Sequence, residues 1–355
     1  MSELQPYDAV LLVSFGGPEG PDEVLPFMQR VTAGRGIPED RLREVSRHYL
    51  DHFDGVSPIN AANRQLLDDL ASEFAHRGWD LPIEWGNRNA PPFLPEALQA
   101  LVDAGHRRVL AVLTSAYPSY SSCRQYRENL HDALAEVPDP PQVDLVTPYA
   151  HRQGFARAQA DALLAGIERA RQRPRVVFVT HSIPESMDSA SGPDGGAYLR
   201  WHLDLAGDIA RRAGEALGAE LTWELAFCSR SGPPTVPWQE PDINDRLREL
   251  AEQGERSVVV LPFGFISDHM EVVYDLDIEA AATAAEVGMD FVRAATVGTD
   301  PRFVAMLCDA LADRARVARG SEPRPDLIAG GQTWTPCAAN CCANQRSPER
   351  ASLAT

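Results

Sequence analysis

The 355-residue sequence contains no apolar run of the roughly 18 residues that a membrane-spanning helix requires. Its longest apolar stretches, such as residues 258–265, have the length of a strand. Residues 1–8 carry neither the basic flank nor the long apolar core of a secretory signal. We therefore expect a cytoplasmic protein without an integral membrane segment.

Basic side chains are also scarce relative to acidic ones. The sequence has 33 Lys and Arg and 51 Asp and Glu, which gives a net charge of −18. Such a field repels phosphate backbones, so nucleic acid is not an expected partner. It favours cations, although an acidic surface can also serve solubility alone. The first glycine-rich turn, Phe15-Gly-Gly-Pro18, lacks both G-x-G-x-x-G and a phosphate-binding lysine, which argues against a nucleotide site.

Apolar, β-branched runs alternate with helical periodicity along the chain. The runs lie at residues 8–14, 108–114, 142–146, 175–180, 221–227, 257–265 and 291–294, and a helix is expected over 154–170. Continuous apolar strands between helices indicate parallel sheets covered on both faces. The pattern runs twice, so we predict an α/β protein of two similar Rossmann-like, doubly wound domains, 7–148 and 149–318. A cysteine-containing C-terminal extension, 319–355, follows them.

His181 is the first candidate for chemistry. In open parallel sheets, ligands bind beyond the carboxyl ends of the strands, and Thr180-His181-Ser-Ile-Pro184 closes a strongly apolar strand. A neutral imidazole there can accept a proton or ligate a borderline metal ion near pH 7. The alternative is a histidine whose nitrogens are satisfied by loop backbone.

Three carboxylates form the second candidate. If a helix starts near Asp268, then Glu271, Asp275 and Glu279 fall on one face at i, i+4 and i+8. Like charges at this spacing repel by a few tenths of a kcal/mol. The stripe therefore costs stability unless a cation or moving protons use it. The alternative is a solvated acidic helix start that the helix dipole favours.

A rigid loop and a group of cysteines complete the candidates. Gly55-Val-Ser57-Pro58 can present a hydroxyl and backbone N–H groups to an anion. The spacing Cys337-x3-Cys341-Cys342 is too cramped for a common zinc ribbon but is compatible with an iron–sulfur cluster. A fourth ligand must come from elsewhere, and Cys123, after a strand end, is a better candidate than Cys228 or Cys308. Free, disordered tail thiols are the alternative.

Five segments together resemble the ferrochelatase family, in family order, over about residues 7–305. They are Leu-Val-Ser-Phe15-Gly-Gly-Pro18, Gly55-Val-Ser57-Pro58-Ile, Thr180-His181-Ser-Ile-Pro184, Ser231-Gly-Pro-Pro with Pro237-Trp238 and Glu240-Pro241, and Gly264-Phe-Ile-Ser-Asp268-His-Met-Glu271-Val-Val-Tyr-Asp275. The resemblance implies two Rossmann-like domains without a nucleotide. It also implies insertion of ferrous iron, the metal substrate, into a porphyrin.

By this resemblance, His181 faces the porphyrin centre and Glu271 stands opposite it, so that both can accept protons or hold the substrate iron. Asp275 and Glu279 match an acidic string that conducts metal ions or protons from that pocket. A bent porphyrin ring exposes its nitrogen lone pairs, and binding energy from the rest of the macrocycle supplies the strain.

The same resemblance predicts porphyrin contacts in the first half of the chain. Ser57 and Tyr126 match positions that contact propionates, and Arg47 and Tyr49 are approximate matches to further ones. Phe15 stands where some relatives have a tyrosine beneath the macrocycle, which removes an axial oxygen ligand on that face.

A subset of ferrochelatases carries a 2Fe-2S cluster on one internal cysteine and three in a C-terminal extension. Cys123, Cys337, Cys341 and Cys342 fit that plan, and the cluster would staple the tail to the first domain, as a structural clamp or as a sensor. Similarity to actinobacterial-type members favours coproporphyrin III over protoporphyrin IX as substrate, and a soluble monomer is expected.

Two competing interpretations stay open. A related chelatase could insert cobalt or nickel into another tetrapyrrole, because a histidine with a carboxylate does not select iron by itself. A haem-binding or iron-sensing protein could also use a chelatase scaffold. Retention of both His181 and Glu271 argues against a carrier, which needs no paired base.

Overall fold

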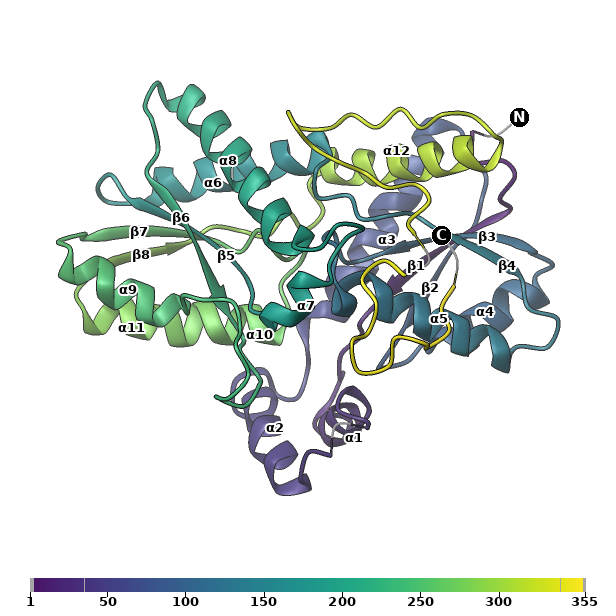
Figure 1. Cartoon of the computed structure of the whole chain (residues 1–355), viewed down its shortest axis with the longest axis horizontal. Helices are drawn as coiled ribbons and strands as arrows, with labels where there is room; N and C mark the ends of the chain where they lie inside the picture. Colours follow the sequence, from purple (N-terminus) through teal and green to yellow (C-terminus); the bar gives the residue numbers. More distant parts are fainter. Residues whose placement is uncertain (1–2, 35, 339, 354–355) are drawn as a thin grey trace.

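The computed structural model describes residues 3–34, 36–338 and 340–353, and in this part of the chain two four-stranded parallel sheets form (Figure 1). The first sheet has the order β2-β1-β3-β4 and the second has the order β6-β5-β7-β8. Their strands are β1 (Ala9–Ser14), β2 (Ile83–Asn87), β3 (Arg108–Leu113), β4 (Gln142–Leu145), β5 (Arg175–His181), β6 (Trp223–Cys228), β7 (Ser257–Leu261) and β8 (Asp290–Arg293). The same strand order in both halves confirms the predicted pair of doubly wound sheets.

Helices cover both faces of each sheet. They are α1 (Pro21–Val31), α2 (Glu39–Phe53), α3 (Pro58–Arg77), α4 (Leu94–Asp103), α5 (Gln125–Glu136), α6 (Gln153–Arg169), α7 (Glu185–Ser189), α8 (Ala197–Leu217), α9 (Ile243–Glu252), α10 (Met270–Val272), α11 (Ala281–Glu286) and α12 (Pro301–Ala318), with π-helical segments η1 (Tyr120–Arg124) and η2 (Val273–Ala280). In the second half, α6 and α8 lie on one side of the sheet and α9 and α11 on the other (Figure 1).

The alternation of side chains along the central strands explains this double cover. In β1, Val10 and Leu12 enter one apolar cluster, whereas Leu11 and Val13 enter another on the opposite face. Because both faces are buried, the strand reads as a continuous apolar run. The cluster that contains Val10 also takes up residues of the second half, so a single core joins the two sheets.

The last helix also connects the halves. Helix α12 packs against α3 and α6, and its Asp309 lies 2.6 Å from Arg77 of α3. Arg314 of the same helix pairs with Asp144 of β4 at 3.1 Å. These ion pairs tie the end of the second half to the first. The domain boundaries 7–148, 149–318 and 319–355 stay predictions.

Local details correct three sequence expectations. The sequence interpretation did not identify β2, a short edge strand that includes the polar residues Glu84 and Asn87. Strand β7 ends at Leu261 and not at 265, because Pro262 has no N–H to continue the ladder. The helix expected from Asp268 begins at Met270 and widens at once into η2. No helix of the described chain is both long and apolar enough to cross a membrane.

Candidate active site

His181 is the last residue of β5, at the carboxyl edge of the second sheet where the sequence placed it. Its Nδ1 lies 2.5 Å from the carbonyl oxygen of Ser182. A carbonyl only accepts, so Nδ1 carries the ring proton and Nε2 keeps its lone pair. That Nε2 is 3.8 Å from Oε2 of Glu271, and the two side chains are 31% and 47% exposed. A basic nitrogen and a carboxylate therefore face each other at a position open to ligand.

The carboxylate stripe does not lie on one regular α-helix: Glu271 is in the short α10, whereas Asp275 and Glu279 lie on η2. A π-helical turn is wider than an α-helical turn, with i→i+5 bonds, and such turns are frequent at functional sites. Burial, together with the charges of Glu271 and Glu279, raises the pKa of Asp275 to about 7. A hydrogen bond from Ser229 and the charge of His181 act in the opposite direction. The stripe thus contains a carboxyl that exchanges protons near neutral pH.

Two residues beside this stripe were missed by sequence reasoning. Desolvation by burial lowers the pKa of His269, which feels the charges of Glu271 and His181, so its imidazole is neutral at pH 7. Ser229 follows β6 with φ of 61°, a left-handed conformation that is uncommon for a residue other than glycine. Its Oγ hydrogen-bonds Oδ2 of Asp275. His269 lay inside the quoted motif, but nothing local in the sequence marks Ser229.

Ser229 should set the pH dependence of Asp275. In the Ser229→Ala variant the hydrogen bond that lowers the pKa of Asp275 is lost, so this pKa rises above about 7. More of the carboxyl is then protonated at pH 7, and a step that needs the carboxylate becomes slower. We expect the acid limb of the pH–rate profile to move to higher pH while the rate at alkaline pH is retained.

Ser229→Gly is the matched control for backbone strain. It removes the same hydroxyl but relieves the left-handed conformation, which costs a residue with a Cβ about 1 kcal/mol. Both variants should show the same shift of the profile, and only the glycine variant should gain stability. An unshifted acid limb in both would remove Ser229 from the control of Asp275.

The first half of the chain contributes an aromatic and cationic group. The Arg88 guanidinium lies 4.4 Å from the Tyr126 ring centroid and 5.4 Å from the Phe15 ring centroid. Phe15 meets Phe27 of α1 edge to face, with centroids 6.1 Å apart. Phe15 and Tyr126, distant in sequence, are thus brought to one cation, which sequence reasoning did not single out.

The other positions expected from the resemblance have different environments. Ser57 is only 3% exposed and is the N-cap residue of α3, where a Cβ on Gly17 would come within 2.5 Å of it. Tyr49 of α2 is buried, and burial together with the charge of Glu271 raises the pKa of its hydroxyl. Arg47 is exposed on the same helix. Helix α2 of the first half therefore approaches the carboxylate of the second.

Cys123, Cys337, Cys341 and Cys342 lie close together, whereas their role as cluster ligands stays a prediction. Cys341 Sγ lies 3.7 Å from Cys342 Sγ, and side-chain hydrogen bonds join Cys123 to Cys342 and Cys337 to Cys341. The N–H of Gly192 donates to Cys342 Sγ at 3.1 Å. Hydrogen bonds from Cys337 and Cys342, aided by Arg127 and Arg124, hold the pKa of Cys341 well below its usual range.

The remaining two cysteines are buried elsewhere. Cys228 belongs to the apolar cluster of the second sheet, and Cys308 is enclosed within α12. Among the described residues, no three His, Cys, Asp or Glu side chains converge as they would around a single metal ion. Neither the gathered thiols nor the His181–Glu271 pair is therefore a preformed mononuclear centre.

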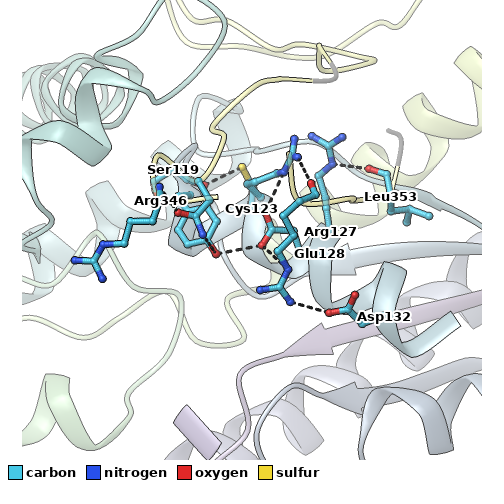
Figure 2. A network of polar contacts seen from close by, with 11 residues as sticks. Ser119, Cys123, Arg127, Glu128, Asp132, Arg346 and Leu353 are labelled. Atoms are coloured by element: carbon cyan, nitrogen blue, oxygen red, sulfur yellow. Dashed lines mark hydrogen bonds and ion pairs between the residues drawn. The ribbon is translucent and has the colours of Figure 1, made fainter. Parts of the chain in front are cut away.

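A separate polar network docks the cysteine tail on α5 (Figure 2). Glu128 is fully buried, with Arg124 at 3.3 Å, Arg350 of the tail at 3.4 Å and the Tyr120 hydroxyl at 3.1 Å. The Arg127 Nε donates to the carbonyl of Leu353 at 2.7 Å. The tail is thus held by paired charges that do not involve a thiol.

Comparison with known proteins agrees with this arrangement. The family model described as ferrochelatase matches residues 7–315. The chain belongs to the ferrochelatase family. It is 49% identical to a coproporphyrin III ferrochelatase of Streptomyces coelicolor, over 96% of this chain and 94% of that protein. It is 47% identical to one of Frankia alni, over 98% of this chain and 89% of that protein.

A solved structure of this chelatase-like fold, SirB from Bacillus subtilis with Fe3+, superimposes with a TM-score of 0.52 at 14% identity. The match covers 89% of this chain and 98% of SirB. At this low identity the likeness concerns the fold alone. The two-sheet architecture of this ferrochelatase is thus shared with SirB.

Proposed function

We propose that this ferrochelatase inserts ferrous iron into coproporphyrin III and yields Fe-coproporphyrin, a step of haem biosynthesis. The observation that carries the proposal is the His181–Glu271 pair, whose Nε2 and Oε2 are 3.8 Å apart at the carboxyl edge of the sheet. The substrate assignment is supported by relatives named coproporphyrin III ferrochelatase that align over nearly the whole chain.

The chemistry asked of the protein is proton removal and metal transfer. Two pyrrole N–H protons leave as Fe²⁺ sheds water and binds four nitrogens, and no redox step is needed. His181 Nε2 has the free lone pair to accept one proton, and the Glu271 carboxylate beside it can accept the other or hold the iron. Asp275, whose pKa is about 7, and Glu279 then pass protons or metal ions along η2.

The porphyrin would be bound mainly by the first half of the chain. We place Phe15 beneath the macrocycle, where its ring has no hydroxyl to ligate iron, and Ser57 and Tyr126 near the propionates. The stack of Arg88 on both aromatic rings supports this placement, because it brings a cation next to the predicted propionate contacts.

We further propose that Cys123, Cys337, Cys341 and Cys342 hold a 2Fe-2S cluster. The gathered thiols, the low pKa of Cys341 and the N–H of Gly192 suit such a group, because thiolates ligate iron and N–H donors stabilise the cluster sulfurs. A bound cluster would supply a clamp between tail and body, or a one-electron sensor.

We also propose that the protein is a cytoplasmic monomer. Its net charge of −18 supports the monomeric state, because copies of the chain repel one another.

The visible absorption of free porphyrin tests this function directly. Anaerobically purified protein is mixed with Fe²⁺ and either coproporphyrin III or protoporphyrin IX, and loss of the free-base bands is followed. Fast loss with coproporphyrin III is expected, and a preference for protoporphyrin IX would overturn the substrate. Binding without metallation would favour a haem carrier or iron sensor, and metallation by Co²⁺ or Ni²⁺ alone would favour another chelatase.

A further inference from the structure

A buried polar network lies directly behind the end of β5 and takes part in no step proposed above. It consists of Thr180, the residue before His181, and of Tyr198 and His202, which stand four residues apart on α8. Thr180, Tyr198 and His202 are 1%, 5% and 0% exposed. Polar groups buried this deeply need partners, and their partners here converge on the backbone of His181.

The contacts give the network a defined proton order. His202 Nδ1 donates to the carbonyl of Tyr198 at 2.7 Å. Desolvation lowers the pKa of His202 to about 3, so the ring is neutral and Nε2 accepts from the Thr180 hydroxyl at 2.8 Å. The Tyr198 hydroxyl donates its single proton to the carbonyl oxygen of His181 at 2.8 Å, and its oxygen is in contact with Thr180 Oγ1 at 2.9 Å, whose own proton is directed to His202.

Close packing holds these groups in place. The Tyr117 ring stacks on His202 with centroids 3.7 Å apart and an interplanar angle of 9°. On the other side, the backbone of Gly264 approaches so closely that a Cβ there would lie 2.1 Å from Thr180 Oγ1. The stacked ring restrains the imidazole of His202, and Gly264 allows the backbone to lie close to the Thr180 hydroxyl.

The peptide group that follows His181 is therefore fixed at both of its polar atoms. Tyr198 donates to its oxygen, the carbonyl of His181, and its N–H, on Ser182, donates to the carbonyl of Cys228 at 2.8 Å. The carbonyl of Ser182 in turn receives the Nδ1 proton of the imidazole. The direction of Nε2 thus depends on the backbone that Tyr198 anchors.

We propose that Tyr198, kept in place by Thr180 and His202, is a positioning residue that aims His181 Nε2 at the reacting porphyrin. This inference rests on the proposed role of His181 as a proton acceptor. The His181 ring is 31% exposed at a strand end, and its Nδ1 is held by the carbonyl of Ser182, so its direction follows the local backbone. A catalytic group misplaced by about 1 Å can lower the rate up to 10²-fold. A residue that fixes the backbone of His181 can therefore affect the rate without contacting the substrate.

The Tyr198→Phe variant removes the hydroxyl and keeps the ring. We expect kcat for iron insertion to fall about tenfold, the scale of one buried hydrogen bond. The KM for porphyrin should stay within about twofold, because no substrate contact is lost. A role in folding alone would not separate kcat from KM in this way.

Tyr149→Phe is the matched control. The Tyr149 hydroxyl is equally buried and donates to the carbonyl of Leu113 at 2.8 Å, at the end of β3 in the other sheet. This variant loses the same kind of bond, with a comparable drop in Tm, and should keep the wild-type kcat. An equal loss of kcat in both variants, or in neither, overturns the proposal.

Two further variants keep the outcome decisive. If Tyr198→Phe does not fold, Thr180→Val breaks the same network with an isosteric side chain, and a wild-type kcat there overturns the positioning role. His181→Ala separates this inference from the proposed function. An inactive His181→Ala with a normal Tyr198→Phe overturns the positioning role alone. An active His181→Ala overturns both the positioning role and the role of His181 as proton acceptor, while iron insertion itself stands.

Discussion

The His181→Ala variant is expected to lose porphyrin metallation by about 10²- to 10⁴-fold, the usual contribution of a general base. The imidazole supplies a nitrogen with a free lone pair, 3.8 Å from Glu271. Without it, the pyrrole protons lose the proposed acceptor next to Glu271. The rate of free-base band loss with Fe²⁺ measures the effect, and porphyrin binding by fluorescence quenching should change little.

A control histidine shows that the loss is local. His131 is exposed on α5, and its replacement by alanine should leave the metallation rate unchanged. Both variants should stay close to the wild-type Tm, because His131 is exposed and the His181 side chain is partly exposed, at 31%. Retention of the wild-type rate by His181→Ala would remove this histidine from the mechanism and leave proton transfer to Glu271 or solvent.

The Cys341→Ser variant should lose the visible absorption of the proposed cluster completely. Cys341 stands in the middle of the thiol group, with hydrogen bonds to both Cys337 and Cys342. A serine oxygen is a poorer ligand for iron than a thiolate, so the remaining three cysteines cannot complete the set. Anaerobic purification followed by absorption spectroscopy and iron and sulfide analysis measures the loss.

The tail should nevertheless stay docked in this variant. Glu128 with Arg124 and Arg350 holds it through charges that no cysteine supplies (Figure 2). Resistance of the C-terminal segment to limited proteolysis should therefore resemble that of the wild type. Glu128→Gln, which removes the buried charge but leaves every thiol, should expose the tail instead.

Cys308→Ser provides the matched cysteine control. This thiol is buried in α12, away from the other thiols, and an unpaired hydroxyl there costs about 1–3 kcal/mol. The variant should be less stable than the wild type but should keep the full visible absorption of the proposed cluster. Colour that survives Cys341→Ser, or disappears in Cys308→Ser, would show that the proposed ligand set is wrong.

The sequence itself determined the fold class and the location of the chemistry. The apolar run through Val10 and Leu12 predicts a strand buried on both faces, and periodicity of this kind depends only on neighbouring residues. His181 follows such a run directly, so the rule that ligands bind at carboxyl ends located it. The stripe of Glu271, Asp275 and Glu279 is visible in the spacing alone, as is the clustering of three cysteines in the tail.

The tertiary structure alone decided which distant groups act on these residues. Ser229, 46 positions before Asp275, reaches its carboxylate only because β6 ends beside η2. Tyr198 reaches the carbonyl of His181 because α8 packs against the sheet that contains β5. Local sequence patterns also predicted neither the π-helical form of η2 nor the edge strand β2. Contacts between residues far apart in the sequence set the pKa and the orientation of a side chain. The periodicity of neighbouring residues does not encode these contacts.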